Sequence, residues 1–117
     1  MIHMTTEKGT VSISTHVYTQ ISGIAATNCF GVKGMAFRSR TDGLVHLLRK
    51  EAMTKGVYVT FEEDDSISID MHIVVKHGVN IPVVTNSIIS EVRYVVASCT
   101  GTHVKTVNVF VDSIVID

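Results

Sequence analysis

The clearest pattern of hydrophobic and polar positions runs from Ser66 to Gly101. Apolar and polar side chains alternate through residues 66–76, which predicts a strand with one buried and one solvent-facing side. Asp70 and His72 belong to the polar set and are expected to be exposed. The apolar positions are Ile67, Ile69, Met71, Ile73 and Val75, and only Val74 breaks the alternation.

A long helix is predicted to follow this strand. Gly78 can turn the chain, Asn80 can cap the helix with its side-chain oxygen, and Pro82 suits the first turn, where its missing N–H is not needed. Gly101 is expected to end the helix in the left-handed conformation. Apolar residues recur at steps of three and four in between, at Ile81, Val84, Ile88, Val92, Val95 and Cys99.

The first third of the chain predicts a strand, a helix and a second strand. The first strand covers residues 10–14, and Ser14 or Thr15 can cap a helix that ends at Gly31. The second strand covers residues 32–37. Gly34 interrupts it, which indicates a bulge or a close approach of two backbones. The apolar positions of the helix are Val17, Ile21, Ile24, Ala25 and Cys29.

The middle of the chain predicts a short helix followed by a hairpin. Asp42 can cap the helix, which stops before Gly56 and carries Leu44, Leu47 and Leu48. Residues 57–61 alternate as a strand, and the acidic residues 63–65 form the turn into the strand at residue 66.

The last strand has Val107, Val109 and Val111 on one face. Ile114 and Ile116 have the opposite parity, so a bulge near residues 112–113 is expected to return both side chains to the core.

These elements predict an α+β fold, a two-layer sandwich in which amphipathic helices cover one face of a mixed β-sheet. The expected order is β-α-β-α-β-β-α-β. Residues 1–8 show no periodicity and are expected to be a flexible N-terminal tail, while residues 9–117 form a single domain.

Composition restricts the classes of function. The 117 residues are 45% hydrophobic with a mean hydropathy of +0.32, so some apolar surface is expected at an interface with a partner or with a second copy. No apolar run approaches the roughly 18 residues that span a bilayer, and no segment resembles a secretion signal. The sequence therefore predicts a cytoplasmic protein without a transmembrane segment of its own.

A search for catalytic chemistry gives few candidates. The six histidines lack metal-ligand spacing, and Cys29 and Cys99 are best interpreted as buried free thiols. Asp70 and His72 share one strand face and could pair, but no nucleophile accompanies them. Neither a metal, a cofactor nor an enzymatic activity is expected. Residues 31–34 read Gly-Val-Lys-Gly and match the GxxG element of KH domains, although here the element runs from a helix into a strand.

Charge is unevenly distributed. Residues 33–55 contain six basic and two acidic residues, so this segment carries +4 and the rest of the chain −5. A basic, leucine-containing helix can bind an acidic partner or an anionic membrane. The predicted partner surface consists of Arg38, Arg40, Arg49, Lys50, Lys55 and Val83.

Several segments together resemble the bacterial alkaline shock or envelope stress response proteins, especially their short YloU-like branch. These segments are GTVSIS, ISGIAA, GVKGMAF, DGLVHLLRKE, KGVYV, SIDMHIVVKHGVNIP and VNVFV, with TG before the last, and they span residues 9–116. Relatives usually carry a glutamate after Asn-Ile-Pro, where this chain has Val83. The resemblance implies a small cytoplasmic α+β domain without established enzymatic activity, tied to cell-envelope stress. It also implies protein partners such as a membrane anchor or a fatty-acid-activating enzyme.

The resulting hypothesis is a non-enzymatic adaptor or scaffold of the envelope stress response or envelope homeostasis, acting through protein–protein contacts as a single chain or a homo-oligomer. Membrane association is expected only through a partner. Two alternatives stay open: a KH-like RNA-binding module that uses Gly31–Gly34 and the basic segment, and a regulator of fatty-acid or lipid metabolism. The scarcity of aromatic residues, 6% of the chain, argues against nucleic acid as the partner.

Overall fold

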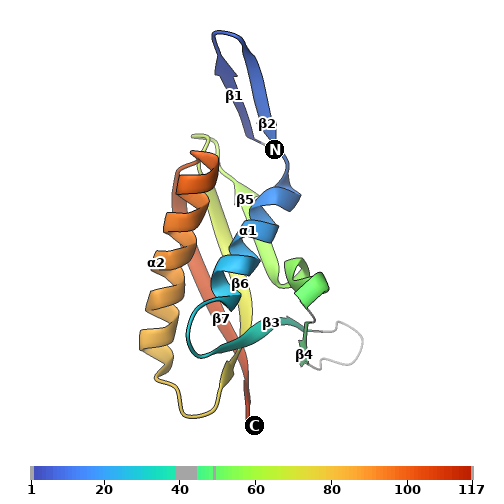
Figure 1. The fold of residues 1–117 in the computed structure, drawn as a ribbon, viewed down its shortest axis with the longest axis vertical. Helices are drawn as coiled ribbons and strands as arrows, with labels where there is room; N and C mark the ends of the chain where they lie inside the picture. Colours follow the sequence, from blue (N-terminus) through green and yellow to red (C-terminus); the bar gives the residue numbers. More distant parts are fainter. Residues whose placement is uncertain (1, 39–44, 49, 117) are drawn as a thin grey trace.

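The computed structural model of the chain describes residues 2–38, 45–48 and 50–116. It contains the α-helices α1 and α2, a short 3₁₀ helix η1, and seven strands (Figure 1). In chain order the elements are β1 (Ile2–Thr6), β2 (Gly9–Ile13), α1 (Thr15–Thr27), β3 (Val32–Arg38), β4 (Val45–Leu47), η1 (Lys50–Gly56), β5 (Val57–Phe61), β6 (Ile67–Lys76), α2 (Ile81–Thr100) and β7 (Val104–Val115).

Strand β6 is the centre of a mixed five-stranded sheet. Its first half pairs antiparallel with β5 and its second half pairs antiparallel with β3, so two strands share one edge of β6. The other edge pairs in parallel with β7 along its whole length. Strand β4 extends the sheet beyond β3. The predicted α+β architecture with a mixed sheet is confirmed.

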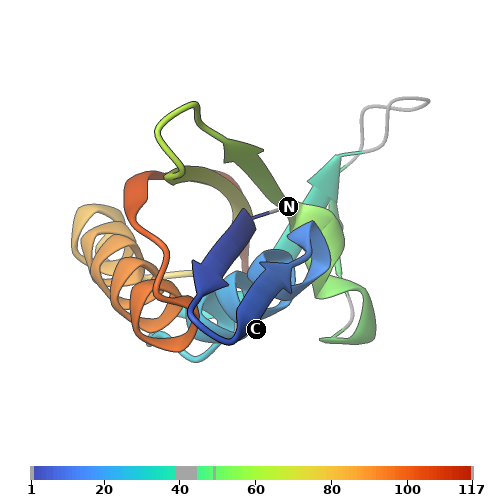
Figure 2. The same cartoon turned by 90° about the horizontal axis from the view of Figure 1, so that it is seen from above.

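Both α-helices lie on the same side of this sheet (Figures 1 and 2). The side chains that β6 directs toward them are fully buried, and Val84, Ile88, Val92 and Val96 of α2 pack over them. Tyr18 of α1 is also fully buried: its ring meets Phe61 edge-on and its hydroxyl lies 2.7 Å from Thr102 Oγ1. The core is therefore the layer between one sheet face and the helices.

Gly56 lies where β3 and β5 meet along β6. A Cβ added to this residue would lie 2.8 Å from the carbonyl oxygen of Ala36 and 3.2 Å from that of His72. Because both neighbours are backbone atoms of the sheet, neither can rotate away. Only a residue without a side chain fits at this junction.

The elements from β6 to α2 were predicted correctly. The side chain of Asn80 accepts a hydrogen bond from the backbone N–H of Val83, which caps α2, and Pro82 lies in the first turn. Gly101 ends the helix with φ +73°, in the left-handed region. The bulge predicted at Gly34 is present in β3, as is the one near Asp112 in β7.

Other predictions were wrong. Residues 2–6, expected in a flexible tail, form β1 and pair with β2 in a hairpin that projects from the body (Figure 1). The short helix expected after Asp42 is replaced, within the described residues, by β4 and η1. Leu48 N–H donates to the carbonyl of Met35, so sheet pairing overrides the local helical pattern here.

The buried face of α1 also differs from the prediction. Val17 and Ile24 are exposed, and the helix buries Tyr18 together with the small residues Ser22, Ala25 and Ala26. This face contacts α2 and η1, and Gly23 is in contact with Met53 of η1. Because small side chains permit close packing, the available partners decided which face is buried.

The exposure of several other side chains differs from the prediction. Cys99 is exposed and Cys29 is partly buried, so the two thiols are not equally protected. The bulge at Asp112 places Ile114 opposite Val75, but Ile114 and Ile116 remain exposed because they lie beyond the part of the sheet that the helices cover. Asp70 and His72 are only partly exposed, since β5 and β7 flank them on both sides.

Candidate functional site

The predicted partner surface divides into parts that the structure describes and parts that it does not. Arg40 and Arg49 lie outside the described residues, and Arg38 and Lys50 are described by their backbone alone, at the end of β3 and the start of η1. Lys55 is exposed at the end of η1. Val83 is also exposed, and it is the residue around which a defined site is found.

That site is a groove of about 440 Å³ at the start of α2. The loop between α1 and β3 contributes Phe30, and the loop and first turn after β6 contribute the rest. Phe30 is 89% exposed and Val83 is 64% exposed, which is unusual for side chains of this size. The described lining residues are Phe30, Lys76, His77, Gly78, Val79, Asn80, Val83 and Val84.

Backbone geometry holds the two walls of the groove together. The N–H of Lys76 donates to the carbonyl of Gly31 at 3.0 Å, which joins the α1–β3 loop to the end of β6. Gly31 has φ +88°, and a Cβ there would lie 3.0 Å from Val84 and 3.1 Å from Val79. A glycine is required both by the conformation and by this close packing. The loop therefore presents Phe30 at a fixed place beside α2.

The helix cap sets the other wall. The bond of 3.1 Å from Val83 N–H to Asn80 Oδ1 fixes the first turn of α2 and directs Val83 away from the core that Val84 enters. Full burial of a side chain such as valine or phenylalanine contributes about 1.5–3 kcal/mol. Two such anchors beside a preformed groove suit hydrophobic contact with another protein.

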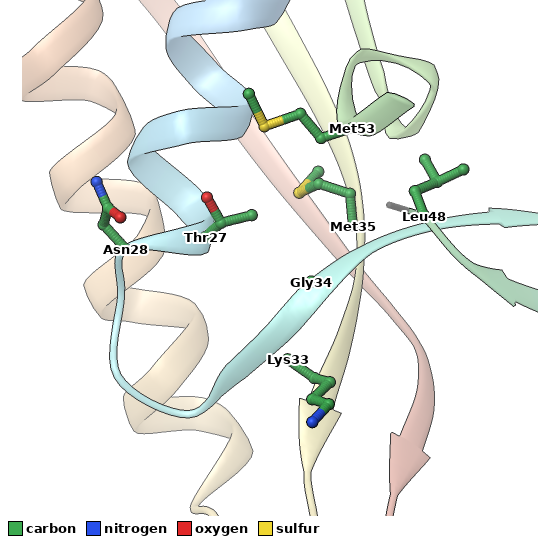
Figure 3. A pocket seen from close by; sticks show the side chains of 7 residues that line it. All are labelled: Thr27, Asn28, Lys33, Gly34, Met35, Leu48 and Met53. Carbon is green, nitrogen blue, oxygen red and sulfur yellow. The ribbon is translucent and has the colours of Figure 1, made fainter. Parts of the chain in front are cut away.

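A second cavity of about 280 Å³ lies between the end of α1, β3 and η1 (Figure 3). Met35, Leu48 and Met53 form its apolar side, and Lys33 points away from the methionines. Of the described residues that line it, only Lys33 is ionisable, so they provide no acid–base pair. The remaining lining residues are Thr27, Asn28 and Gly34.

Asp70 and His72 do not form the pair considered from the sequence. Asp70 Oδ1 accepts a hydrogen bond from Asn108 Nδ2 at 2.9 Å, and His72 Nδ1 lies 3.0 Å from Asp112 Oδ2. Both residues are therefore engaged with β7 rather than with each other. Within the described residues no three histidine, cysteine or acidic side chains are grouped to hold a metal ion.

Two titratable groups have shifted pKa values. Burial raises the pKa of the Cys29 thiol, and the negative charge of Glu91 raises it further. Hydrogen bonds from the hydroxyl and the N–H of Ser66 lower the pKa of the Asp64 carboxyl in the β5–β6 turn. Both shifts have structural causes, and neither group lines the groove.

Gly31 and Gly34 do not form the turn between two helices that a KH domain uses to clamp a nucleic-acid backbone. Gly31 packs against Val79 and Val84, and Gly34 lies within β3 opposite Val74. A Cβ at Gly34 would lie 2.9 Å from Leu47 Cδ1, so close packing accounts for this glycine.

Comparison with known proteins assigns the family. The model of the alkaline shock protein family, which is described as having a cell envelope-related function, matches residues 3–116. The chain belongs to this family. The resemblance to the alkaline shock proteins is thereby confirmed.

Relatives of this alkaline shock family chain cover nearly its whole length. It is 37% identical over 114 residues to the uncharacterized protein YloU of Bacillus subtilis, covering 97% of this chain and 94% of the relative. The uncharacterized protein Spy1614 of Streptococcus pyogenes is also 37% identical over 114 residues, covering 97% and 93%. The uncharacterized protein YqhY of B. subtilis is 35% identical over 117 residues, covering 100% and 85%. No solved structure gives a significant match.

The described helices of this alkaline shock family chain include none that is both long and apolar enough to cross a membrane. The two α-helices instead place their apolar faces on the sheet. What sequence reasoning missed in the site was Phe30, since a single aromatic residue between a helix and a strand belongs to no periodic pattern. Its position before a glycine that must adopt positive φ was the available signal.

Proposed function

We propose that this chain is a non-enzymatic adaptor or scaffold of cell-envelope homeostasis that acts through protein–protein contacts. The observation that carries the proposal is the apolar groove flanked by Phe30 and Val83, both highly exposed beside a rigid wall. Its family, described as having a cell envelope-related function, supports the cellular setting. The absence of a metal-binding group among the described residues is consistent with this role but does not carry it.

The adaptor works in the cytoplasm and reaches the membrane through a partner. A membrane anchor or a fatty-acid-activating enzyme is the partner that the resemblance suggests, and regulation of lipid metabolism is then a consequence of the second choice. The apolar groove contributes short-range affinity. The basic segment of residues 33–55, with its charge of +4, adds attraction to an acidic partner surface.

The test removes the two apolar anchors together. Phe30→Ser with Val83→Glu puts a polar residue on one wall and the acidic residue usual in relatives on the other. The variant should lose most of the recovery of the native partner in a quantitative pull-down from the source cell, because each lost anchor contributes about 1.5–3 kcal/mol when buried. Circular dichroism should show an unchanged fold, since both side chains are exposed.

Tyr94→Ser is the matched control. Tyr94 is 69% exposed on α2 but is not among the described residues lining the groove, so its loss should leave recovery unchanged. Equal recovery by the groove variant and the control would refute the groove as the contact surface.

A second variant, Arg49→Glu with Lys50→Glu, separates the basic segment from the groove. Loss of binding that fades in high salt would assign the contact to charge, while a loss insensitive to salt would assign it to the groove.

A further inference from the structure

The sheet has a second face, which carries a different kind of surface. Both α-helices lie on one side of the sheet, so the side chains of Ser68, Asp70 and His72 point to the other side. Tyr58 of β5 and Phe110 of β7 share this open face, and they are 52% and 45% exposed. The open face thus presents two partly exposed aromatic rings with polar groups between them.

Three rings form a row across the central strands. The rings of Tyr58 and His72 meet edge to face with centroids 5.7 Å apart, and those of His72 and Phe110 stack at 4.8 Å with an angle of 15°. His72 and Phe110 are direct partners across β6 and β7. Their spacing equals the distance between neighbouring strands, so both ring planes stand across the pairing direction. The second surface of Phe110 therefore faces the outer edge of β7.

Carboxylates lie beside this row of rings. Asp70 is held by Asn108 at 2.9 Å, and Asp112 is held by His72 at 3.0 Å. A carboxylate has about four lone-pair directions, so one hydrogen bond leaves acceptor capacity on each. The cluster of Tyr58, Asp70, His72, Asn108, Phe110 and Asp112 contains two acidic residues and no lysine or arginine.

Aromatic faces and carboxylates together are the groups that attract a cation. An arginine side chain is the best fit, because its planar guanidinium stacks on a ring and donates hydrogen bonds to carboxylates at its rim. A phosphate backbone or an anionic lipid would be repelled by the same carboxylates. The chemistry of the cluster therefore selects a basic protein segment.

The adjoining edge of the sheet can hold such a segment. Strand β7 pairs with β6 and with no second strand among the described residues. Its pairing shifts register near each end, close to Lys105 and Asp112, and is regular through residues 106–111. Bulges and lysines are the features that protect sheet edges, so the run between them is the part of β7 open to pairing.

We propose that the outer edge of β7 docks an extended segment of a partner protein, with an arginine of that segment stacked on Phe110 and directed toward Asp112 and Asp70. The segment adds as a strand through main-chain hydrogen bonds, and its arginine occupies the position next to Phe110 on the open face. This surface is made by β5, β6 and β7, and it is separate from the groove made by Phe30 and Val83. The inference therefore stands whether or not the groove binds the adaptor's partner.

The experiment uses the full chain and a blocked peptide, Thr-Ser-Thr-Arg-Thr-Ser-Thr, which is soluble and favours extended structure. Titration followed by amide NMR should shift the resonances of residues 106–111. Replacing the arginine by citrulline, its neutral planar isostere, should weaken binding about tenfold, the order expected for a partly desolvated cation on a ring. N-methylation of alternate peptide amides should abolish binding, because a methylated amide cannot join the sheet.

Protein variants test the same contacts from the other side. Phe110→Ala and Asp112→Asn should each weaken binding of the arginine peptide and leave the weaker binding of the citrulline peptide nearly unchanged. Phe30→Ser in the groove and Tyr94→Ala on α2 are matched controls and should change the binding of neither peptide.

Four results would overturn the proposal. Equal affinity for arginine and citrulline peptides would remove the cation, and equal affinity for N-acetylarginine amide would remove the extended segment. Resonance shifts confined to the groove or to α2 would move the contact elsewhere. Concentration-dependent broadening of the residues of β7 without peptide would assign the edge to a second copy of the chain.

Discussion

Substitution of Gly56 by alanine should test how the sheet is assembled. Strands β3 and β5 approach β6 from the same side, and Gly56 is the residue at which they meet. An added Cβ would lie 2.8 Å from the carbonyl oxygen of Ala36 and 3.2 Å from both the carbonyl oxygen of His72 and the Cβ of Met35. The two oxygens belong to sheet backbone, so relief requires the ends of β3 and β5 to move apart.

The magnitude follows from two opposing effects. Overpacking of a well-packed site costs about 1–3 kcal/mol, and a contact with backbone belongs near the upper end of that range. Alanine also reduces the conformational entropy of the unfolded chain, which offsets about 0.4–1 kcal/mol. The free energy of unfolding should therefore fall by roughly 1–2 kcal/mol for Gly56→Ala, and further for Gly56→Ser, whose side chain is larger.

Urea denaturation followed by circular dichroism measures this change, and each kcal/mol should lower the melting temperature by roughly 3–6 °C for a domain of this size. Gly101 supplies the comparison, because a Cβ there meets nothing within 4 Å and only φ +73° disfavours it. Asparagine tolerates that conformation, so Asn should be the milder change at Gly101 and the harsher one at Gly56. A Gly56→Ala protein as stable as the wild type would refute the shared edge of β6.

Three further outcomes are expected. Gly101→Val should lower the free energy of unfolding by about 1 kcal/mol or more through the left-handed cap alone, and an unchanged melting temperature would show that the cap contributes nothing. Met71→Asp should unfold the domain, because an unpaired carboxylate at a fully buried position costs several kcal/mol, whereas Ser90→Asp on the exposed side of α2 should be silent in the same melting experiment. Cys99 should react with a thiol reagent before Cys29, because Cys99 is exposed while burial raises the pKa of Cys29. Cys99→Ser should then remove the fast phase, and its loss in Cys29→Ser instead would reverse the assignment.

The stretch from β6 to α2 could be predicted from the sequence because each of its signals is local. Alternation through residues 66–76, the cap at Asn80 and the glycine at position 101 act over a few residues, and no distant partner has to be known. The bulges at Gly34 and Asp112 were also readable, the first from a glycine inside a strand and the second from a change of parity. These features were enough to predict the α+β class and the central strand.

The candidate sites depended on contacts between distant segments. Residues 45–56 carry leucines at helical spacing, yet sheet pairing of Leu48 with Met35 outweighed that weak local preference. Helix α1 has apolar residues on more than one face, and packing against α2 and η1 chose the side with Tyr18 and the small residues.

The two surfaces show the same limit. Val83 could be singled out from the sequence as an exposed apolar residue, but its partner Phe30 came from a loop that only the hydrogen bond from Lys76 to Gly31 brings beside α2. The row of Tyr58, His72 and Phe110 joins three strands whose register no local pattern specifies. Sequence determines which side chains share a face of one element, because that depends on backbone period alone. Which faces become neighbours is decided by the packing of the whole chain.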